Sequence, residues 1–507
     1  MSVGRSSRHY TGKSHFGLEA HEIARRAEKH RQVDQAASRF FGIVNPASFI
    51  ERHLKILNTR SSESATAEQI LARLEQMPVS SRHLRIRLFV GIATFFDGID
   101  ALAIAYVLPV LVGVWDISPQ RIGILISAGY VGQLLGAVFA GWIAERIERL
   151  PTMVYTVAAY AVFSLLCALS WDYTSLLVFR TLQGLGLGGE VPVAAAYINE
   201  FAKAKGRGRF VLVYEQVYSA GRLMAALLGV WVVTRFGWRY MFLFGGLPAL
   251  LVVFLRRCLP ESPRWLASQG RLEEADRVVK QMEFNAPVEM TRGAMVRHQP
   301  AEKAQWKELF QGTYRSRTFT SWAVWFIAFL LLNGLATWVP TLYATVFRLP
   351  VQTALRYGAI SSGAGFAGCI AVALLIDWSG RRLWYLCAFS LAGLACVGLW
   401  LFGAGSVVAV VIVASITTFA ANSIAMLVFL HTPEIYPTRI RALATSVASA
   451  WLRVASIVAP LFIGFTIETY HLGAVFLVFG AMACIGALIT GLFSIETKDR
   501  VLEEISP

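Results

Sequence analysis

The chain has 507 residues, of which 56% are hydrophobic and only 16% are charged, and its mean hydropathy is +0.54. Soluble proteins carry about a quarter charged residues, so this composition excludes a soluble globular fold, as well as collagen, a coiled coil or a disordered chain. The formal charge of +15 could suggest nucleic acid, but the basic residues lie in tails and loops between apolar runs, where orientation in a membrane explains them. We therefore expect the lipid bilayer, and no nucleic acid, as a partner.

Residues 1–85 are polar and hold 14 Lys and Arg against 8 Asp and Glu. They lack the apolar stretch that a secretion signal requires, so we expect this tail to stay in the cytoplasm. Within it, residues 68–77 place their apolar side chains on one helical face and are followed by Pro78, which ends a helix. We expect this short helix to lie on the membrane surface.

Twelve apolar segments follow, and each is long enough for a membrane-spanning helix of about 20 residues. They begin near residues 86, 119, 151, 175, 209, 238, 319, 355, 381, 406, 441 and 470. One long polar stretch separates the first six from the last six. The sequence thus predicts an all-α integral membrane protein with an N-terminal tail (1–85), a six-helix bundle (86–258), a linker (259–318), a second six-helix bundle (319–494) and a C-terminal tail (495–507).

The basic residues of the short loops indicate the orientation of the chain. An even number of spans places both termini on one side of the membrane. The loops on the side of the tail hold ten Lys and Arg, and the opposite loops hold five. Because basic loops stay inside, we expect both termini to be cytoplasmic and the protein to lie in the plasma membrane or a bacterial inner membrane.

Charged motifs at the ends of the spans recur in the two halves at offsets of 232, 234 and 235 residues. The matching motifs are Glu145 with Arg149 and Asp377 with Arg381, Glu200 and Glu434, and Glu261 and Glu496. Such repeats predict two six-helix halves related by a pseudo-two-fold axis along the membrane normal. A central cavity between the halves would then be exposed to either side by rocking one half against the other.

Three motifs give the chain a resemblance to the major facilitator superfamily over residues 70–507. Residues 180–190 (RTLQGLGLGGE) resemble the Arg-and-glycine signature of the fourth span. Residues 260–266 (PESPRWL) and 433–438 (PEIYPT) resemble elements shared by sugar porters, metabolite:proton symporters and synaptic vesicle glycoproteins. The resemblance implies the major facilitator fold and a transport function.

Within the superfamily, the first and eleventh spans resemble those of the aromatic-acid and nicotinate-type metabolite:proton symporters. The similar residues are 97–100 (DGID) and Arg453, which stands seven residues before Pro460. The chain departs from the superfamily in the loop after the second span, where Glu148 replaces the expected turn glycine and Leu150 the last basic residue. We therefore expect altered gating at this loop.

Ionisable residues inside membrane spans are costly, so they are functional candidates. Asp97 and Asp100 are three residues apart and fall on one face of the first helix, where two carboxylates in a partly desolvated site suit proton uptake and release. Glu190 lies in the fourth span between a run of glycines and Pro192, and we add it as a third proton-coupling candidate. The alternative for each is a structural contact with a neighbouring helix.

Two arginines within the spans are the anion-binding candidates, because a planar guanidinium binds a carboxylate in a bidentate manner. Arg453 lies in the eleventh span and Arg222 in the fifth. Arg222 could instead pair with an acid of the first or fourth helix. If both arginines reach the cavity, the substrate is an anion.

Several polar and aromatic residues of the spans could complete a substrate site, although packing against lipid or protein is the commoner role of the aromatic ones. The candidates are Gln216, Tyr218, Asn333, Trp338 and Asn422. The glycine run at residues 184–189 has no strand before it, so we interpret it as a helix-packing surface and not as a nucleotide site. No cysteine or histidine spacing suits a metal, and we expect no cofactor other than the coupled proton.

Charged loops at the cytoplasmic face are the predicted gate. Arginines and carboxylates of the two halves could form ion pairs that close this face and break when it opens. The resemblance implies the same role. The candidates are Glu145, Arg146, Arg149, Glu200, Asp377, Arg381, Arg382 and Glu434.

The sequence thus predicts a secondary active transporter, and not an enzyme, that couples proton movement to the uptake of a small organic anion such as an aromatic or heterocyclic carboxylate. A transporter of neutral sugars or polyols is the first alternative, favoured by the elements shared with sugar porters and disfavoured by the arginines in the spans. A membrane receptor that does not transport is the second. We expect the protein to be a monomer.

Overall fold

The computed structural model describes residues 66–77, 81–201, 207–283, 305–403 and 405–500. Within these ranges every regular element is a helix, and no strand occurs. The helices follow the long apolar runs, because only a helix satisfies its own backbone hydrogen bonds inside a bilayer. The predicted all-α membrane fold is confirmed.

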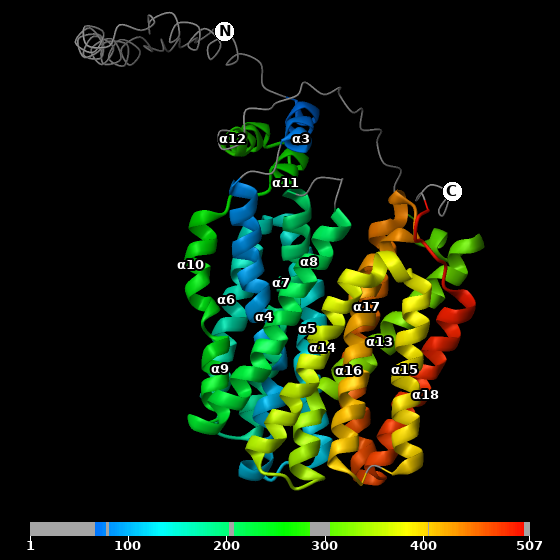
Figure 1. Ribbon diagram of the computed structural model, residues 1–507. Coiled ribbons are helices and arrows are strands. Elements are labelled where there is room, and N and C mark those ends of the chain that lie inside the picture. The colour runs from blue at the N-terminus through cyan, green and yellow to red at the C-terminus, as the bar shows by residue number, and fades with distance from the viewer. Residues whose placement is uncertain (1–65, 78–80, 202–206, 284–304, 404, 501–507) are drawn as a thin grey trace, which may run out of the picture. The chain divides into compact units, whose positions relative to one another are not determined.

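The N-terminal half is built from six long helical segments (Figure 1). The sixth consists of two shorter helices, interrupted just before Pro248. The elements are α4 (Ser81–Trp115), α5 (Pro119–Arg146), α6 (Arg149–Ala168), α7 (Tyr173–Phe201), α8 (Arg207–Leu228) with the π-helical turn η1 (Gly229–Val233), and α9 (Arg239–Gly245) with α10 (Pro248–Cys258).

The C-terminal half repeats this arrangement with six helices (Figure 1). They are α13 (Gly312–Thr345), α14 (Val351–Ser379), α15 (Arg381–Phe402), α16 (Val407–Glu434), α17 (Thr438–Thr469) and α18 (Leu472–Phe493). Eleven segments of the described chain are long and apolar enough to cross a membrane. The remaining helix, α7, is not among these eleven. It contains Arg180 and Glu190, which are 3% and 0% exposed because the helix packs between α5 and α6.

The two halves begin earlier than the apolar runs. Helix α4 starts at Ser81 and α13 at Gly312, whereas the apolar pattern placed the first boundary at residue 86 and the second at residue 319. The difference has a simple cause. A membrane helix can continue past the hydrocarbon core wherever its polar side chains reach water, so the first polar turns escape a search for apolar residues.

Helices α5 and α7 approach each other closely through glycines. A Cβ atom on Gly136 would lie 2.0 Å from the carbonyl oxygen of Leu185, and one on Gly188 would lie 1.9 Å from that of Gln133. Small residues that allow such contacts replace the hydrophobic effect as a source of helix association in lipid. The glycine run of α7 is therefore a packing surface, as the sequence predicted.

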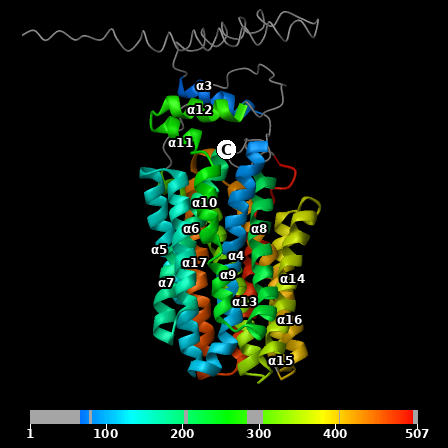
Figure 2. The ribbon, with the colours of Figure 1, turned by 90° about the vertical axis from the view of Figure 1, so that its left-hand side faces the viewer.

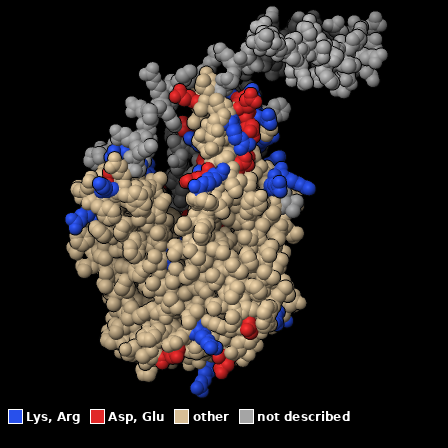
Figure 3. Space-filling model, turned by 180° about the vertical axis from the view of Figure 1, so that it is seen from behind, with Lys and Arg blue, Asp and Glu red and all other residues tan. Residues whose placement is uncertain are grey.

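We call the end of the bundle near α3 (Ala67–Gln76) the linker end and the opposite end the far end. The two halves meet at the far end. At the far end α5 packs on α17. Ser127 Oγ donates to the Ile457 carbonyl at 2.7 Å, and a Cβ on Gly464 would lie 2.5 Å from the Pro119 oxygen. Figure 3 shows a cleft between the halves that opens at the linker end. The structure thus has one closed and one open end.

The linker contributes three short helices, α11 (Pro263–Ser268), α12 (Leu272–Glu283) and the 3-10 helix η2 (Trp306–Phe310). Figure 2 shows α3 lying along α12, and the two helices share a buried apolar face. Arg73 of α3 holds them together, since its guanidinium bonds Asp276 and Glu283 at 2.5 Å each. The expected position of this short helix on the membrane surface is therefore wrong, because its apolar face packs on protein.

We expect Gly136→Ala to destabilise the protein, because the new methyl group would force α5 away from α7 at a cost of about 1–3 kcal/mol. Gly141→Ala on the same helix is the matched control, since no atom lies within 4 Å of the position of its Cβ. The thermal unfolding midpoint of the detergent-solubilised protein measures both. An equal midpoint for the two variants would contradict the close packing of α5 on α7.

We expect Arg73→Ala to weaken the docking of α3 by about 1–2 kcal/mol, because a partly exposed charge-assisted pair is lost. Hydrogen exchange of the α3 amides should become faster at pH 7. Burial acts to raise the pKa of Asp276, but hydrogen bonds from Lys280 and Arg73 outweigh it and hold the pKa below its usual value.

The depressed pKa of Asp276 fixes the pH dependence of this contact. The stabilisation is present above the pKa of an unfolded Asp, about 3.9, and is lost as the pH falls through the lower folded value. The wild-type exchange rate should therefore stay level from pH 7 to 5, after correction for intrinsic exchange. A wild-type rate equal to that of the variant at pH 7 would show that Arg73 does not hold α3.

Candidate functional site

A cavity lies between the two halves, and helices α4, α5, α7, α8, α13, α16 and α17 line it. Its volume is about 800 Å³, including the space at its mouth. Charged and aromatic side chains of both halves face it. Its ionisable and aromatic lining residues are Asp97, Tyr130, Glu215, Tyr218, Arg222, Phe329, Phe429 and Arg453.

The two arginines of the cavity come from opposite halves and reach across it. Arg453 of α17 donates through Nη1 to the side-chain oxygen of Gln133 on α5. Arg222 of α8 donates through Nη1 to the side-chain oxygen of Asn333 on α13, at 3.4 Å. Among the described residues, no carboxylate lies within ion-pair distance of either guanidinium. Both cations therefore face the cavity with only amide ligands.

Carboxylates gather on the N-terminal side of the same cavity. Asp97 of α4 and Glu215 of α8 line it directly. Glu190 of α7 is fully buried behind the lining, where its Oε1 accepts a hydrogen bond from Thr94 at 3.3 Å and its Oε2 has no bonding partner in the described part of the chain. The cavity thus holds guanidinium groups from both halves and carboxylates from the N-terminal half.

Asp97 and Asp100 lie in different surroundings, although they are only three residues apart. Asp100 is 0% exposed and does not line the cavity. It accepts hydrogen bonds from Gln183 and from Ser164, the latter at 3.1 Å, and the same Gln183 accepts a bond from Arg180 at 2.6 Å. Residues three apart differ by about 60° around a helix, which directs Asp100 toward α6 and α7.

The predicted substrate residues divide into two groups. Tyr218, Asn333 and Asn422 line the cavity. Gln216 does not, since its amide donates to the carbonyl of Cys369 on α14 at 2.8 Å and so links the two halves. Trp338 is 1% exposed and lies in the core of α13, away from the cavity. The side chains of Gln216 and Trp338 both point between helices. Their positions along the helices alone could not show this.

Several lining residues were not chosen from the sequence as site residues, among them Tyr130, Gln133 and Glu215. Each has a signal in the sequence, because a carboxamide, a carboxylate or a phenol in an apolar span requires a polar partner. The sequence does not show which way each of these side chains points. Gln133 faces Arg453 only because α5 packs against α17 of the other half.

Two of the predicted gate residues of the N-terminal half, Arg149 and Glu200, form a compact cluster with Glu261 at the linker end. Arg149 at the start of α6 bonds Glu200 of α7 at 3.1 Å. Glu261 accepts hydrogen bonds from the backbone N–H groups of Arg149 and Leu150 at 3.2 and 3.0 Å, and so caps α6. Neither partner of Arg149 belongs to the other half.

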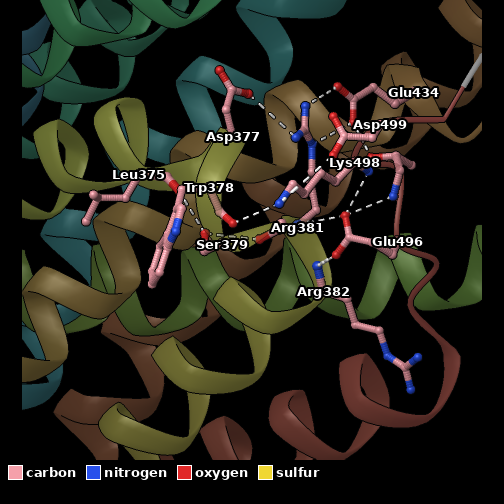
Figure 4. A network of polar contacts seen from close by, with 12 residues as sticks. Leu375, Asp377, Trp378, Ser379, Arg381, Arg382, Glu434, Glu496, Lys498 and Asp499 are labelled. Atoms are coloured by element: carbon pink, nitrogen blue, oxygen red, sulfur yellow. Dashed lines mark hydrogen bonds and ion pairs between the residues drawn. The ribbon is translucent and has the colours of Figure 1, made fainter.

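The C-terminal half contains the matching cluster (Figure 4). Arg381 bonds Glu434 at 3.0 Å and lies 3.7 Å from Asp377. Glu496 accepts hydrogen bonds from the backbone N–H groups of Arg381 and Arg382 at 3.0 Å each, and so caps α15. In each half, an arginine at a helix start, a carboxylate of a neighbouring helix and a capping carboxylate thus form the same network.

The ion pairs of these two clusters lie within the halves, whereas the sequence led us to expect pairs between the halves. Among the described residues, the carboxylate partners of Arg149 and Arg381 come from their own halves. The other gate candidates are exposed: Glu145 reaches solvent, and Arg146 stacks over the ring of Trp142 at 3.8 Å.

The two capping carboxylates respond differently to pH. Burial raises the pKa of Glu261, against the effect of its backbone hydrogen bonds. Burial also acts to raise the pKa of Glu496, but backbone N–H groups, led by that of Arg381, outweigh it and hold the pKa below its usual value. As the pH falls, the cap of the N-terminal half is therefore protonated first.

Glu148, which replaces the expected turn glycine, links the loop after α5 to the linker. Its carboxylate bonds Arg271 at 2.5 Å, and Arg271 also bonds Glu274 of α12 at 2.7 Å. The matching residue of the other half is Gly380, whose φ of +81° suits glycine. The substitution thus ties the loop to the linker of its own half.

Two six-helix halves around a cavity lined by charges from both halves are the architecture of a major facilitator transporter. Solved structures have the same fold. A crystal structure of the D-xylose–proton symporter matches 83% of this chain and 100% of that chain with a TM-score of 0.65 at 20% identity. A partially occluded inward-open structure of the xylose transporter from E. coli gives a TM-score of 0.64 at 19% identity, with 83% and 100% covered.

The family described as "Sugar (and other) transporter" matches residues 46–507, and the chain belongs to this family of membrane transporters. A niacin transporter of Acinetobacter baylyi is 32% identical, with 86% of this chain and 99% of the relative covered. A 4-hydroxybenzoate transporter of the same organism is 28% identical over 65% of this chain and 72% of its own length. A gallate transporter of Pseudomonas putida is 27% identical over 74% and 83%.

Proposed function

We propose that the protein couples the movement of protons to the uptake of a small aromatic or heterocyclic carboxylate, by alternating access. One observation carries this proposal. Arg222 and Arg453, one from each half, face a single cavity, and neither forms an ion pair with a described residue. A partly buried guanidinium without an ion-pair partner is a costly arrangement, so we infer that the substrate carboxylate supplies this partner.

The chemistry of the lining supports an aromatic anion. A guanidinium binds a carboxylate in a bidentate manner, and Tyr130, Tyr218, Phe329 and Phe429 supply flat apolar surface for a ring. The names of the three relatives refer to niacin, 4-hydroxybenzoate and gallate, which are small aromatic acids. A neutral sugar would leave both guanidinium groups without a counter-charge.

Asp97, Asp100 and Glu190 are the proposed proton carriers. Asp97 faces the same cavity as the two arginines, so a proton on its carboxylate removes a negative charge beside the substrate. Asp100 on α4 and Glu190 on α7 are fully buried. They move with these two helices, so their surroundings change when the helices move. Proton and substrate would then together determine which side the cavity faces.

We further propose that the protein acts as a monomer in the plasma membrane or a bacterial inner membrane, with the linker end in the cytoplasm. The excess of basic residues in the loops of that end supports this orientation. The coupled proton is the only cofactor that the proposal requires.

The test is acidification of liposomes that contain the purified protein and an internal pH dye. Nicotinate, 4-hydroxybenzoate, gallate, an aliphatic acid and xylose are added outside in turn. We expect at least one aromatic acid to acidify the interior beyond the signal of empty liposomes. Asp100→Asn should remove this signal and keep the exchange of radiolabelled acid at equal concentrations, because only proton coupling is lost.

Two other results would contradict the proposal. A response to xylose alone would indicate a sugar transporter, and the absence of both acidification and exchange for every compound would indicate a receptor. Acidification that persists in Asp100→Asn would exclude Asp100 from the proton pathway.

We expect Arg453→Ala to weaken binding of the transported acid at least about 30-fold, which corresponds to about 2 kcal/mol for the loss of a charge-assisted hydrogen bond. Arg121→Ala is the control, since Arg121 lies at the far end over the ring of Tyr173 and outside the cavity. Isothermal titration of the detergent-solubilised variants measures both. Unchanged binding in Arg453→Ala would contradict capture of the carboxylate by this arginine.

A further inference from the structure

Two hydrogen bonds cross the cavity in opposite directions. In one, the C-terminal half supplies the arginine (Arg453) and the N-terminal half the amide (Gln133). In the other, the N-terminal half supplies the arginine (Arg222) and the C-terminal half the amide (Asn333). All four side chains line the cavity. Each half therefore supplies the amide ligand for the arginine of the other half.

The orientation of Asn333 is fixed by its neighbours on α17. The hydroxyl of Ser456 donates to the Leu452 carbonyl at 2.7 Å, so its oxygen can only accept from Asn333. Asn333 accordingly directs its NH₂ group to Ser456 at 2.7 Å and its oxygen to Arg222. The amide is thus held as an acceptor for a guanidinium of the opposite half.

The position of Gln133 is fixed by the close packing of α5 on α7. Its backbone lies directly against two glycines, since a Cβ on Gly188 would lie 1.9 Å from its oxygen and one on Gly184 3.0 Å from its nitrogen. The side chain is 7% exposed and reaches the cavity beside Arg453. Gln133 therefore moves with the N-terminal half as a rigid body.

An amide oxygen is a weaker ligand for a guanidinium than a carboxylate is. Bonds between two ionised groups are shorter and stronger, and a carboxylate can occupy both arms of the guanidinium. The Arg222 to Asn333 contact of 3.4 Å is also long for a hydrogen bond. An incoming carboxylate can therefore displace both amides, while the amides keep the guanidinium groups in place until it arrives.

We propose that Gln133 and Asn333 are exchangeable ligands, whose amide oxygens occupy in the empty carrier the positions that the substrate carboxylate takes on Arg453 and Arg222. This inference rests on the proposed anion substrate. Binding then replaces a bond between the halves by a bond to the substrate, which frees the halves to move relative to one another. Gln133 and Asn333 are positioning residues in this scheme, because they act through the arginines.

The experiment gives the protein an internal carboxylate at the position of the amide. Gln133→Glu has nearly the same shape and would form a permanent ion pair with Arg453. We expect a higher thermal unfolding midpoint for the substrate-free variant than for the wild type. We also expect the further rise that the transported acid produces in the wild type to be lost, and affinity for the acid to fall about tenfold or more.

Two further variants separate this effect from simpler ones. Gln133→Ala removes the bridge, so the substrate-free midpoint should fall while the acid still raises it. Asn422→Asp adds the same charge to the same cavity, but among the described residues Asn422 bonds the Thr418 carbonyl and Cys369 and forms no hydrogen bond with an arginine. Its substrate-free midpoint should fall, because the new charge has no partner.

A midpoint that falls in Gln133→Glu as it does in Asn422→Asp would overturn the inference, and so would an acid-induced rise as large as in the wild type. If Gln133→Glu does not fold, Asn333→Asp opposite Arg222 replaces it. The Ser456 hydroxyl then turns from the Leu452 carbonyl to donate to the new carboxylate, and the same signs are expected. The substrate-free comparison needs no acid. It therefore tests the bridge even if the liposome experiment finds no transported anion.

Discussion

The partial burial of two guanidinium groups that form no ion pair with a described carboxylate is the constraint on which this structure depends. Arg222 and Arg453 sit in a low-dielectric cavity, where an unbalanced charge is costly. Each is held by an amide of the opposite half, which supplies a ligand but no counter-charge. In the empty carrier each guanidinium therefore has an amide ligand but no ion pair, and an incoming carboxylate can take the place of the amide.

Such a cavity can work only if the surrounding halves move as units. The duplicated clusters at the linker end support this. In each half, one arginine at the start of a helix bonds a carboxylate of a neighbouring helix, and a second carboxylate caps the same helix end; the bonding pairs are Arg149 with Glu200 and Arg381 with Glu434. Close glycine contacts between α5 and α7 add rigidity within the N-terminal half.

The sequence predicted the fold well, because apolar length and the repeated motifs are local signals. It also identified the cavity positions of Asp97, Arg222 and Arg453, since a charge inside a span has few other places to go. It could not separate Asp100 from Asp97, or direct Gln216 and Trp338, because a rotation of about 60° on a helix decides which neighbour a side chain meets. The contact of Gln133 with Arg453, 320 residues away in the sequence, depends on packing between the two halves, which no local pattern contains.

The most direct test is an experimental structure of the protein with a transported aromatic acid bound. We expect the carboxylate to lie within hydrogen-bonding distance of the guanidinium groups of both Arg222 and Arg453, with Gln133 and Asn333 displaced from them. An acid that lies in the cavity with its carboxylate bonded to neither arginine would contradict the account.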